Sequence, residues 1–337
     1  MNFRKGKSIF LMLAAGFILL ITVITLFFFR NDAVDPVPKP DSAEQDTPIY
    51  LAAADLPAEK QLFIHPQTPA PGDFMVVEAG PLASGSAVNL DFDFAGAVST
   101  LYRVGNQLYA VIAICYDNEP SQYSLIIETD AEQTESKTFE TAVNVEEKEF
   151  PSARFSMPAD RTAGWTAERL AEDREKIKQA RKTGEPSPLW LQRFILPLEG
   201  RVTSSYGAIR VINNNPPRRH TGIDIGAEEG TPVIAPNNGV VRLAEHLLAG
   251  GKTVIIDHGM DLSSAYMHMH SIAVEEGEIV ERGDLIGTVG MTGYATGPHL
   301  HWEANIGQTP VNPEQLLEDD LLWIPPAYVE KMLSGNR

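Results

Sequence analysis

A segment without charged side chains, "SIFLMLAAGFILLITVITLFFF" from Ser8 to Phe29, constrains the chain more than any other feature. Its 22 residues are enough for a helix that crosses the hydrocarbon core of a bilayer. Three basic residues precede the segment and an acidic stretch follows it, so the positive-inside bias places the amino terminus in the cytoplasm. A cleaved signal peptide is the alternative, but it would have a shorter apolar run and a small-residue cleavage site. We therefore expect a single-pass anchor in the cytoplasmic membrane, with the remaining chain on the outer (periplasmic or extracytoplasmic) side.

Length and charge limit what the exported part can be. The 337 residues are enough for two globular domains, each with its own core. The formal net charge of −18 disfavours nucleic acid as a partner, because its phosphates would repel the protein. Cys115 is the one cysteine, so the chain has no intramolecular disulfide. It lies in the apolar run "LYAVIAICY" and is read as a small buried hydrophobe.

Composition divides the chain into segments of different character. The stretch after the apolar segment is rich in proline and acidic residues, which is typical of a flexible spacer. Short apolar runs then predict strands of a small β-sandwich, and Gly105-Asn106 is a two-residue hairpin signal between two of them. The predicted domains are a stub and anchor (1–30), a linker (31–48), a β-sandwich (49–158), a helical connector (159–192), a second β-rich domain (193–323) and a tail (324–337).

The clearest helix signal in the chain is "TAERLAEDREKIKQARK", from Thr166 to Lys182. Thr166 can cap the amino end, and a glycine and a proline follow the carboxyl end. Acidic residues are concentrated in the early turns and basic ones in the late turns, which suits the helix dipole. Leu170 and Ile177 form only a narrow apolar stripe, so we expect a connector that lies across one domain with a solvated outer face.

From about Arg193 the chain consists of short strand-like runs separated by glycines, and most of the histidines lie here. His220 and Asp224 are four residues apart in "RRHTGIDIG", a spacing that keeps two side chains on one side of a strand. His299 and His301 in "TGPHLHW" alternate and would also share a face. Imidazole nitrogens with one carboxylate oxygen suit zinc, and three protein ligands would leave a position for water, as in a catalytic site.

The segment from about Leu196 to Leu317 resembles the lysostaphin-type (LytM-like) zinc metallopeptidases, which cut peptidoglycan peptides. The resemblance is carried by "SSYG", "HTGIDIGAEEGTPVIAP", "VIIDHG", "AYMHM", "GEIVERGDLIGTVGMTGYATGPHLHWE" and "VNPEQLL", in the family's order. It implies a mainly β fold, with an antiparallel β-sheet peptidase domain that follows the β-sandwich and the connecting helix. It also implies one Zn²⁺ per catalytic domain.

The same resemblance assigns roles to individual residues. His220, Asp224 and His301 match the family's zinc ligands. His268 and His299 match its two catalytic histidines, which would move the proton of the attacking water and stabilise the developing oxyanion.

Two more residues are candidates for contact with the substrate or the oxyanion. Tyr206 in "SSYG" is a candidate oxyanion donor, and the alternative is that it lines the groove. His270 stands where the family usually has a small polar residue, and in a strand it would share a face with His268. It could then compete for metal or reach substrate, and the alternative is a substitution on the rim of the site.

The function predicted is that of a membrane-anchored zinc endopeptidase that hydrolyses peptidoglycan peptide bonds. The β-sandwich would hold the catalytic domain away from the membrane or bind a cell-wall or divisome partner. One alternative is a non-catalytic or gated regulator of other cell-wall hydrolases, with "VINNNPPRRH" as a lid. A more remote one is a carrier or transport-adaptor domain, which the glycine-turned hairpins also resemble, although a carrier needs a lysine at a hairpin tip and Lys252 lacks that setting.

Overall fold

The computed structural model describes residues 62–318, with gaps at 67, 81, 83–86, 99–100, 105–106, 131–136, 157, 159–161, 163, 183, 191 and 214. The chain divides into two compact units, residues 1–47 and 48–337, and every described residue belongs to the second. The predicted membrane anchor lies outside the described residues. Within the described ranges, no helix has the length and apolar character that a membrane span requires.

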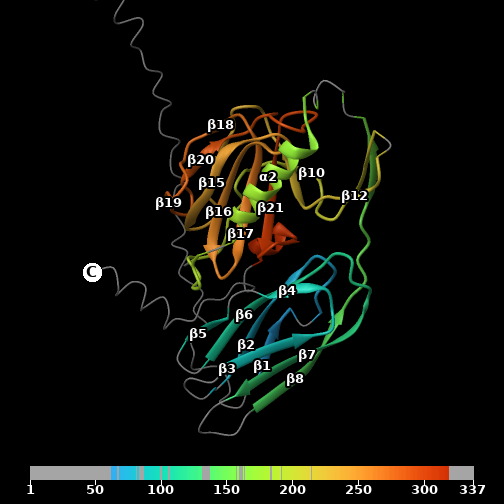
Figure 1. The fold of residues 1–337 in the computed structure, drawn as a ribbon, viewed down its shortest axis with the longest axis vertical. Helices are drawn as coiled ribbons and strands as arrows, with labels where there is room; N and C mark the ends of the chain where they lie inside the picture. The colour runs from blue at the N-terminus through green and yellow to red at the C-terminus, as the bar shows by residue number, and fades with distance from the viewer. Residues whose placement is uncertain are drawn as a thin grey trace, which may run out of the picture. The chain divides into compact units, whose positions relative to one another are not determined.

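The segment predicted as a β-sandwich forms two antiparallel sheets (Figure 1). One contains β1 (Leu62–His65), β2 (Phe74–Ala79), β6 (Gln107–Ile114), β4 (Gly96–Val98) and β5 (Tyr102–Val104). The other contains β3 (Ala87–Phe92), β7 (Ser121–Asp130) and β8 (Lys137–Val145). Both sheets contribute to one apolar core, to which Ile112 of β6 and Ile127 of β7 belong. β6 is buried nearly throughout, so Ile112 and its alternate neighbours face this core while Val111 belongs to the main core of the protein.

Two details refine the predicted boundaries. Val104 pairs with Gln107, so β5 and β6 form the expected hairpin, although its turn residues Gly105-Asn106 lie outside the described residues. β9 (Ser152–Phe155) was expected to belong to the β-sandwich, but it pairs in parallel with β11 (Ile209–Ile212). Together with β12 (Arg218–Arg219) these strands form a separate three-stranded sheet. The backbone of β9 thus finds its hydrogen-bond partners in the segment predicted to be catalytic (residues 193–323, the catalytic segment).

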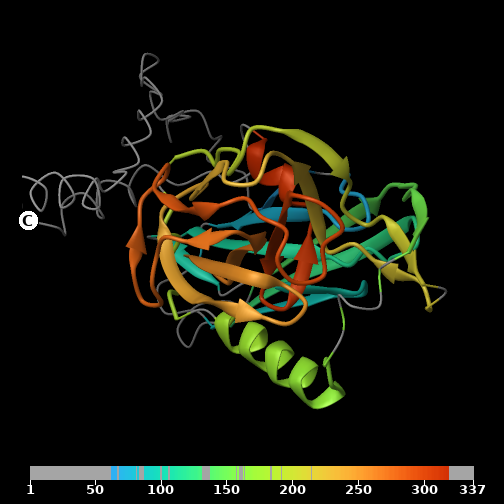
Figure 2. The ribbon, with the colours of Figure 1, turned by 90° about the horizontal axis from the view of Figure 1, so that it is seen from above.

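The connector helix is present as α2 (Ala167–Ala180). Thr166 caps it as predicted, since its side chain accepts a hydrogen bond from the Arg169 amide at 3.3 Å. Ile177 and Ala180 pack on Leu243, Leu247 and Ile255 of the large sheet, and Figures 1 and 2 show α2 running alongside that sheet. The helix therefore uses its narrow apolar stripe to dock on the catalytic segment.

The catalytic segment is built around one large antiparallel sheet. Its strands are, in spatial order, β10 (Arg201–Ser204), β13 (Gly222–Gly226), β21 (His299–Ile306), β17 (Leu262–Met269), β16 (Gly251–Gly259), β15 (Gly239–Leu247) and β19 (Ile279–Val280), with β22 (Thr309–Val311) paired to β21. A small sheet of β14 (Pro232–Ile234), β20 (Leu285–Thr288) and β18 (Ser271–Ile272) accompanies it, and the 3₁₀ helix η2 (Pro313–Leu317) follows. The mainly β architecture expected from the sequence is confirmed.

The two faces of the large sheet bury different side chains. Along β21, Leu300, Trp302 and Ala304 point into the main apolar core. Their neighbours His301 and Glu303 point to the opposite face, as strand alternation requires. That opposite face also carries the cluster on which α2 docks. The polar residues and the helix thus share one face of the sheet.

Candidate metal centre

Two adjacent strands bring the predicted zinc ligands together. β13 pairs with β21 so that Asp224 lies directly opposite His301. Gly222 permits this approach, because a Cβ at its position would lie 2.2 Å from the Trp302 carbonyl oxygen. His220 precedes β13, and its amide donates to the Ala208 carbonyl at 2.9 Å. Strand pairing therefore brings the three side chains together, although His220 and His301 lie 81 residues apart in the sequence.

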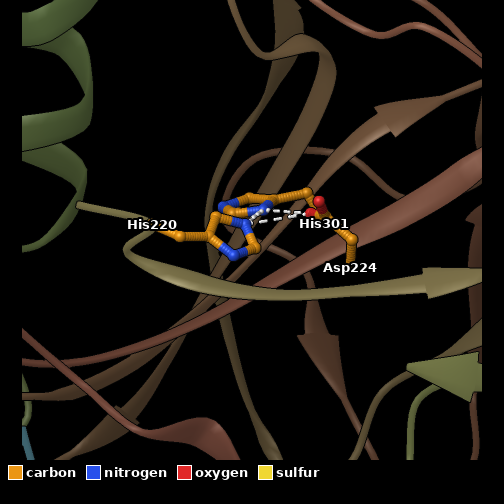
Figure 3. A group of neighbouring side chains, drawn as sticks. All are labelled: His220, Asp224 and His301. Atoms are coloured by element: carbon orange, nitrogen blue, oxygen red, sulfur yellow. Dashed lines mark hydrogen bonds and ion pairs between the residues drawn. The ribbon is translucent and has the colours of Figure 1, made fainter. Parts of the chain in front are cut away.

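The three side chains converge on a single point, as Figure 3 shows. His220 Nε2 lies 3.0 Å from Asp224 Oδ1 and 2.9 Å from His301 Nδ1. His301 Nδ1 lies 2.8 Å from the same Asp224 oxygen. All three residues are buried. Their facing atoms all lie within 4.8 Å of one another, so one ion could contact all three.

The outer nitrogens of the two rings fix their tautomers. His220 Nδ1 faces the Ser205 carbonyl at 2.8 Å, and His301 Nε2 faces Glu303 Oε1 at 3.0 Å. Both partners are acceptors, so these outer nitrogens carry the protons and the inner nitrogens present lone pairs. Two lone pairs and a carboxylate oxygen at hydrogen-bond distance need a shared positive charge. A nitrogen-and-oxygen donor set of this kind fits Zn²⁺, in confirmation of the predicted cofactor.

The pKa values of the cluster reflect the same demand for positive charge. Burial lowers the pKa of His301, but its contacts with Asp224 and Glu303 outweigh burial and raise it to about 9. Burial raises the pKa of Asp224, yet the two histidines hold it well below its usual range. Burial lowers the pKa of His220. Arg210 of β11 forms an ion pair with Asp224 Oδ2, which leaves Oδ1 free to face the histidines.

His268 and His299, the predicted catalytic pair, lie beside the ligands. Their ring centroids are 4.9 Å apart, and the His268 ring is 6.0 Å from that of His301. His268 Nδ1 donates to the Thr292 carbonyl at 2.9 Å, and His299 Nδ1 donates to the Gly297 carbonyl at 2.8 Å. In both rings Nε2 is therefore the nitrogen left to face the site, and that of His299 lies 3.8 Å from Asp224 Oδ1.

The backbone at His268 is unusual. Its φ is +64°, in the left-handed region that non-glycine residues seldom occupy, although histidine does so more often than most. It sits where the pairing of β16 with β17 shifts register, between Tyr266 and Met269. Burial, with the neighbouring histidines, lowers the pKa of His268 to about 3. The ring is thus neutral at physiological pH.

The sequence analysis did not predict the residues that bind the outer side of the metal ligands. Glu303 accepts from His301, and its two oxygens are also bound by Thr221 and by Arg181 at the end of α2. Burial raises the pKa of Glu303, but Arg181 and His301 overcome this and hold it at about 2, so it is ionised. The signal for Glu303 was available, since it lies two residues after His301 on the same strand. No signal marked Arg181 or Arg210.

Two predicted substrate contacts are placed elsewhere by the structure. Tyr206 is only 4% exposed and its hydroxyl donates to the Pro310 carbonyl at 2.8 Å, so the oxyanion role is not supported. His270 does not share the face of His268, because β17 ends at Met269 and the left-handed backbone at His268 breaks the alternation. Its exposed ring pairs with Glu229 at 2.8 Å. This agrees with the alternative of a substitution on the rim.

Part of the chain is similar to known peptidases. Residues 218–313 match the model of Peptidase family M23. An uncharacterized metalloprotease of Haemophilus influenzae is 36% identical over 140 residues, 39% of this chain and 28% of that protein. DD-carboxypeptidase/endopeptidase Mpg of Neisseria meningitidis is 45% identical over 96 residues, 28% and 22% of the two chains. Peptidoglycan DD-endopeptidase ShyA of Vibrio cholerae is 35% identical over 134 residues, which are 39% of this chain and 31% of that protein.

The matches to these curated relatives therefore span less than a third of each relative's length. A crystal structure of a Pseudomonas aeruginosa protein assigned to peptidase M23 is 26% identical, with a TM-score of 0.54. That alignment covers 74% of this chain and 94% of the other, so the likeness extends beyond the metal centre. The family match includes all three predicted ligands and both predicted catalytic histidines. The chain therefore carries a metallopeptidase domain of peptidase family M23.

Proposed function

We propose that the protein is a membrane-anchored zinc endopeptidase that hydrolyses peptide bonds of peptidoglycan on the outer side of the cytoplasmic membrane. The observation that carries the proposal is the convergence of His220, Asp224 and His301 beside two histidines whose Nδ1 atoms are bound to backbone carbonyls. The names of the relatives from Neisseria and Vibrio support peptidoglycan as the substrate. The charge-free segment Ser8–Phe29 supports the anchor and the outer location.

The chemistry follows from what the residues around the metal centre can do. A bound zinc ion would make water acidic near neutral pH and polarise the scissile carbonyl. His268 and His299 then serve as proton acceptors, since their Nδ1 atoms are committed to backbone carbonyls. The histidine that takes the proton of the attacking water can deliver it to the leaving amine.

Exposure distinguishes the two histidines. The His268 ring is buried and neutral, whereas the His299 side chain is 16% exposed. We assign His299 the proton transfer to the leaving amine, because the departing peptide must reach solvent.

The test uses the full chain in detergent, loaded with one equivalent of zinc and incubated with purified cross-linked peptidoglycan. Mass spectrometry of the released fragments should reveal a new amino terminus, which identifies the bond cut. His299→Ala should slow release by about 10²–10⁴-fold while zinc remains bound, the usual contribution of a general acid or base.

Absence of cleavage by the wild-type protein with zinc bound would contradict the proposal and favour a gated or regulatory role. An equal rate for His299→Ala would remove His299 from the mechanism.

A further inference from the structure

The metal ligand His301 is oriented from behind by a buried carboxylate. His301 Nε2 donates to Glu303 Oε1 at 3.0 Å, and the Glu303 side chain is only 5% exposed. A carboxylate on the outer nitrogen of a metal-binding histidine fixes both the tautomer and the ring orientation, and it makes the ligand more basic. The position of Glu303 therefore affects how well His301 can bind an ion.

Glu303 is itself held by a residue outside the sheet. Its Oε2 atom forms an ion pair with Arg181, whose side chain is 14% exposed. A buried carboxylate is strongly destabilised without a partner, so Glu303 depends on this guanidinium to stay in place. Arg181 is the carboxyl-terminal cap residue of α2, and its amide donates to the Ile177 carbonyl at 3.0 Å. The chain of contacts from His301 thus ends on the connector helix.

The helix is fixed to the catalytic sheet along its length. Asp173 accepts from the Leu248 amide at 2.6 Å, Lys176 pairs with Glu245, and Gln308 donates to the Lys178 carbonyl at 3.2 Å. Ile177 and Ala180 pack into the apolar cluster beneath the helix. One member of that cluster, Met267, lies directly opposite His301 across β17 and β21. The docked helix and the metal ligand therefore sit side by side on one face.

We propose that Arg181 is a positioning residue of the metal centre, which holds Glu303 and through it His301. The connector helix is then part of the metal site, in addition to being a spacer between domains. The proposal rests on the metallopeptidase site but on no substrate, so it stands or falls separately from the peptidoglycan activity.

The test compares full-length Arg181→Met and Arg181→Lys with the wild-type protein. Zinc dissociation constants are measured on metal-stripped protein by competition with a chromophoric chelator. Arg181→Met should weaken zinc binding by about 10–100-fold, the usual effect of losing an outer partner of a ligand. It should also change the visible spectrum of the cobalt-substituted protein, because His301 is reoriented. Arg181→Lys should restore part of the affinity, since it restores the positive charge.

Lys176→Met is the matched control. It removes the ion pair to Glu245 from the same helix, but that pair is exposed and away from the ligands. It should leave the zinc dissociation constant and the cobalt spectrum unchanged. If Arg181→Met matches the wild-type protein in both measurements, Arg181 has only a structural role and the proposal fails. Equal weakening by Lys176→Met would also overturn it, because the effect would then come from general loosening of the helix.

A comparison of Glu303→Gln with the double variant covers the case in which Arg181→Met does not fold. Glu303→Gln removes the buried charge that Arg181 neutralises, so Arg181→Met with Glu303→Gln leaves no unpaired carboxylate. If Arg181 acts through Glu303, adding Arg181→Met to Glu303→Gln should change the zinc dissociation constant by about twofold or less. A further tenfold loss would mean that Arg181 acts by another route, and the proposal would be wrong.

Discussion

The β-sandwich and the large sheet of the catalytic segment are both built from antiparallel strands, but they bury different side chains. The core between the two sandwich sheets consists of apolar residues such as Met75, Ile112 and Ile127. In the part of the chain that the structure describes, all the buried polar and charged side chains lie between His220 and Gln315. They are concentrated on the large sheet, where His301 and Glu303 alternate with the apolar residues of β21.

The difference suggests that the β-sandwich core contributes stability, whereas the large sheet carries the residues that can bind metal and react. Burying a polar group is unfavourable unless it is hydrogen-bonded, so a sheet built only for stability avoids such groups. At the metal centre each predicted ligand has its own outer contact. His220 donates to the Ser205 carbonyl, His301 donates to Glu303, and Asp224 forms an ion pair with Arg210. The sandwich should therefore lose stability when it is altered, whereas the large sheet should lose metal and activity.

The largest expected effect comes from removing a metal ligand. His220→Ala should abolish stoichiometric zinc binding and reduce peptidase activity by about 10³-fold or more, because a Lewis acid contributes several kcal/mol to the transition state. Metal analysis after gel filtration and the peptidoglycan assay measure the two losses. Full zinc content in the variant would contradict the assigned ligand set, and it would also bring back the carrier-domain alternative.

The complementary change is made in the sandwich. Ile127→Ala on β7 should lower the free energy of unfolding by about 2–5 kcal/mol, because it leaves a cavity in an apolar core. The zinc dissociation constant should stay at the wild-type value. Urea unfolding and chelator competition provide the two readouts. If zinc affinity falls together with stability, the contrast between the two regions is wrong and the core of the sandwich supports the metal centre.

A pH prediction applies to a buried histidine of the large sheet that is not a ligand. Burial lowers the pKa of His258 from 6.5 to about 4. Between these values the unfolded chain binds a proton that the folded protein does not, so stability falls as pH drops through this window. The loss should reach about 3 kcal/mol, at about 1.4 kcal/mol per pKa unit.

Urea unfolding of metal-stripped protein at pH 4, 5, 6 and 7 measures this slope. His258→Gln cannot be protonated in this range, so its free energy of unfolding should fall less steeply with decreasing pH than that of the wild-type protein. Identical slopes in the two proteins would show that His258 does not cause the loss.

The smallest effect is expected at the start of α2. Thr166→Ala removes the capping oxygen that accepts from the Arg169 amide, and it should lower stability by about 1 kcal/mol. Thr166 lies at the opposite end of the helix from Arg181, so zinc affinity should not change. A small shift in thermal unfolding with an unchanged zinc dissociation constant is the expected result. A clear loss of zinc affinity would mean that fraying at either end of α2 reaches the site.

Local sequence rules explain why much of the secondary structure of this protein could be predicted from its sequence. The Thr166 cap, the β5–β6 hairpin and the pairing of ligands on one face depend on residues that are near in sequence or on strand alternation. The prediction was wrong where the side chains of a strand do not alternate regularly between its two faces. His270 was expected beside His268, but a register shift and a left-handed residue intervene. Tyr206 was considered for the oxyanion, but its hydroxyl is occupied by Pro310.

The sequence by itself therefore determined the mainly β class and the connector helix, because each is encoded by short-range spacing. The metal-ligand set was predicted from the family resemblance, since His220 and His301 lie 81 residues apart. Only the tertiary structure decided which residues support those ligands. Arg181 lies 122 residues before Glu303, and Arg210 reaches Asp224 from a different sheet. Such contacts depend on where the helix and the β11 strand dock, and docking is set by the packing of the whole apolar core. No local spacing rule encodes it.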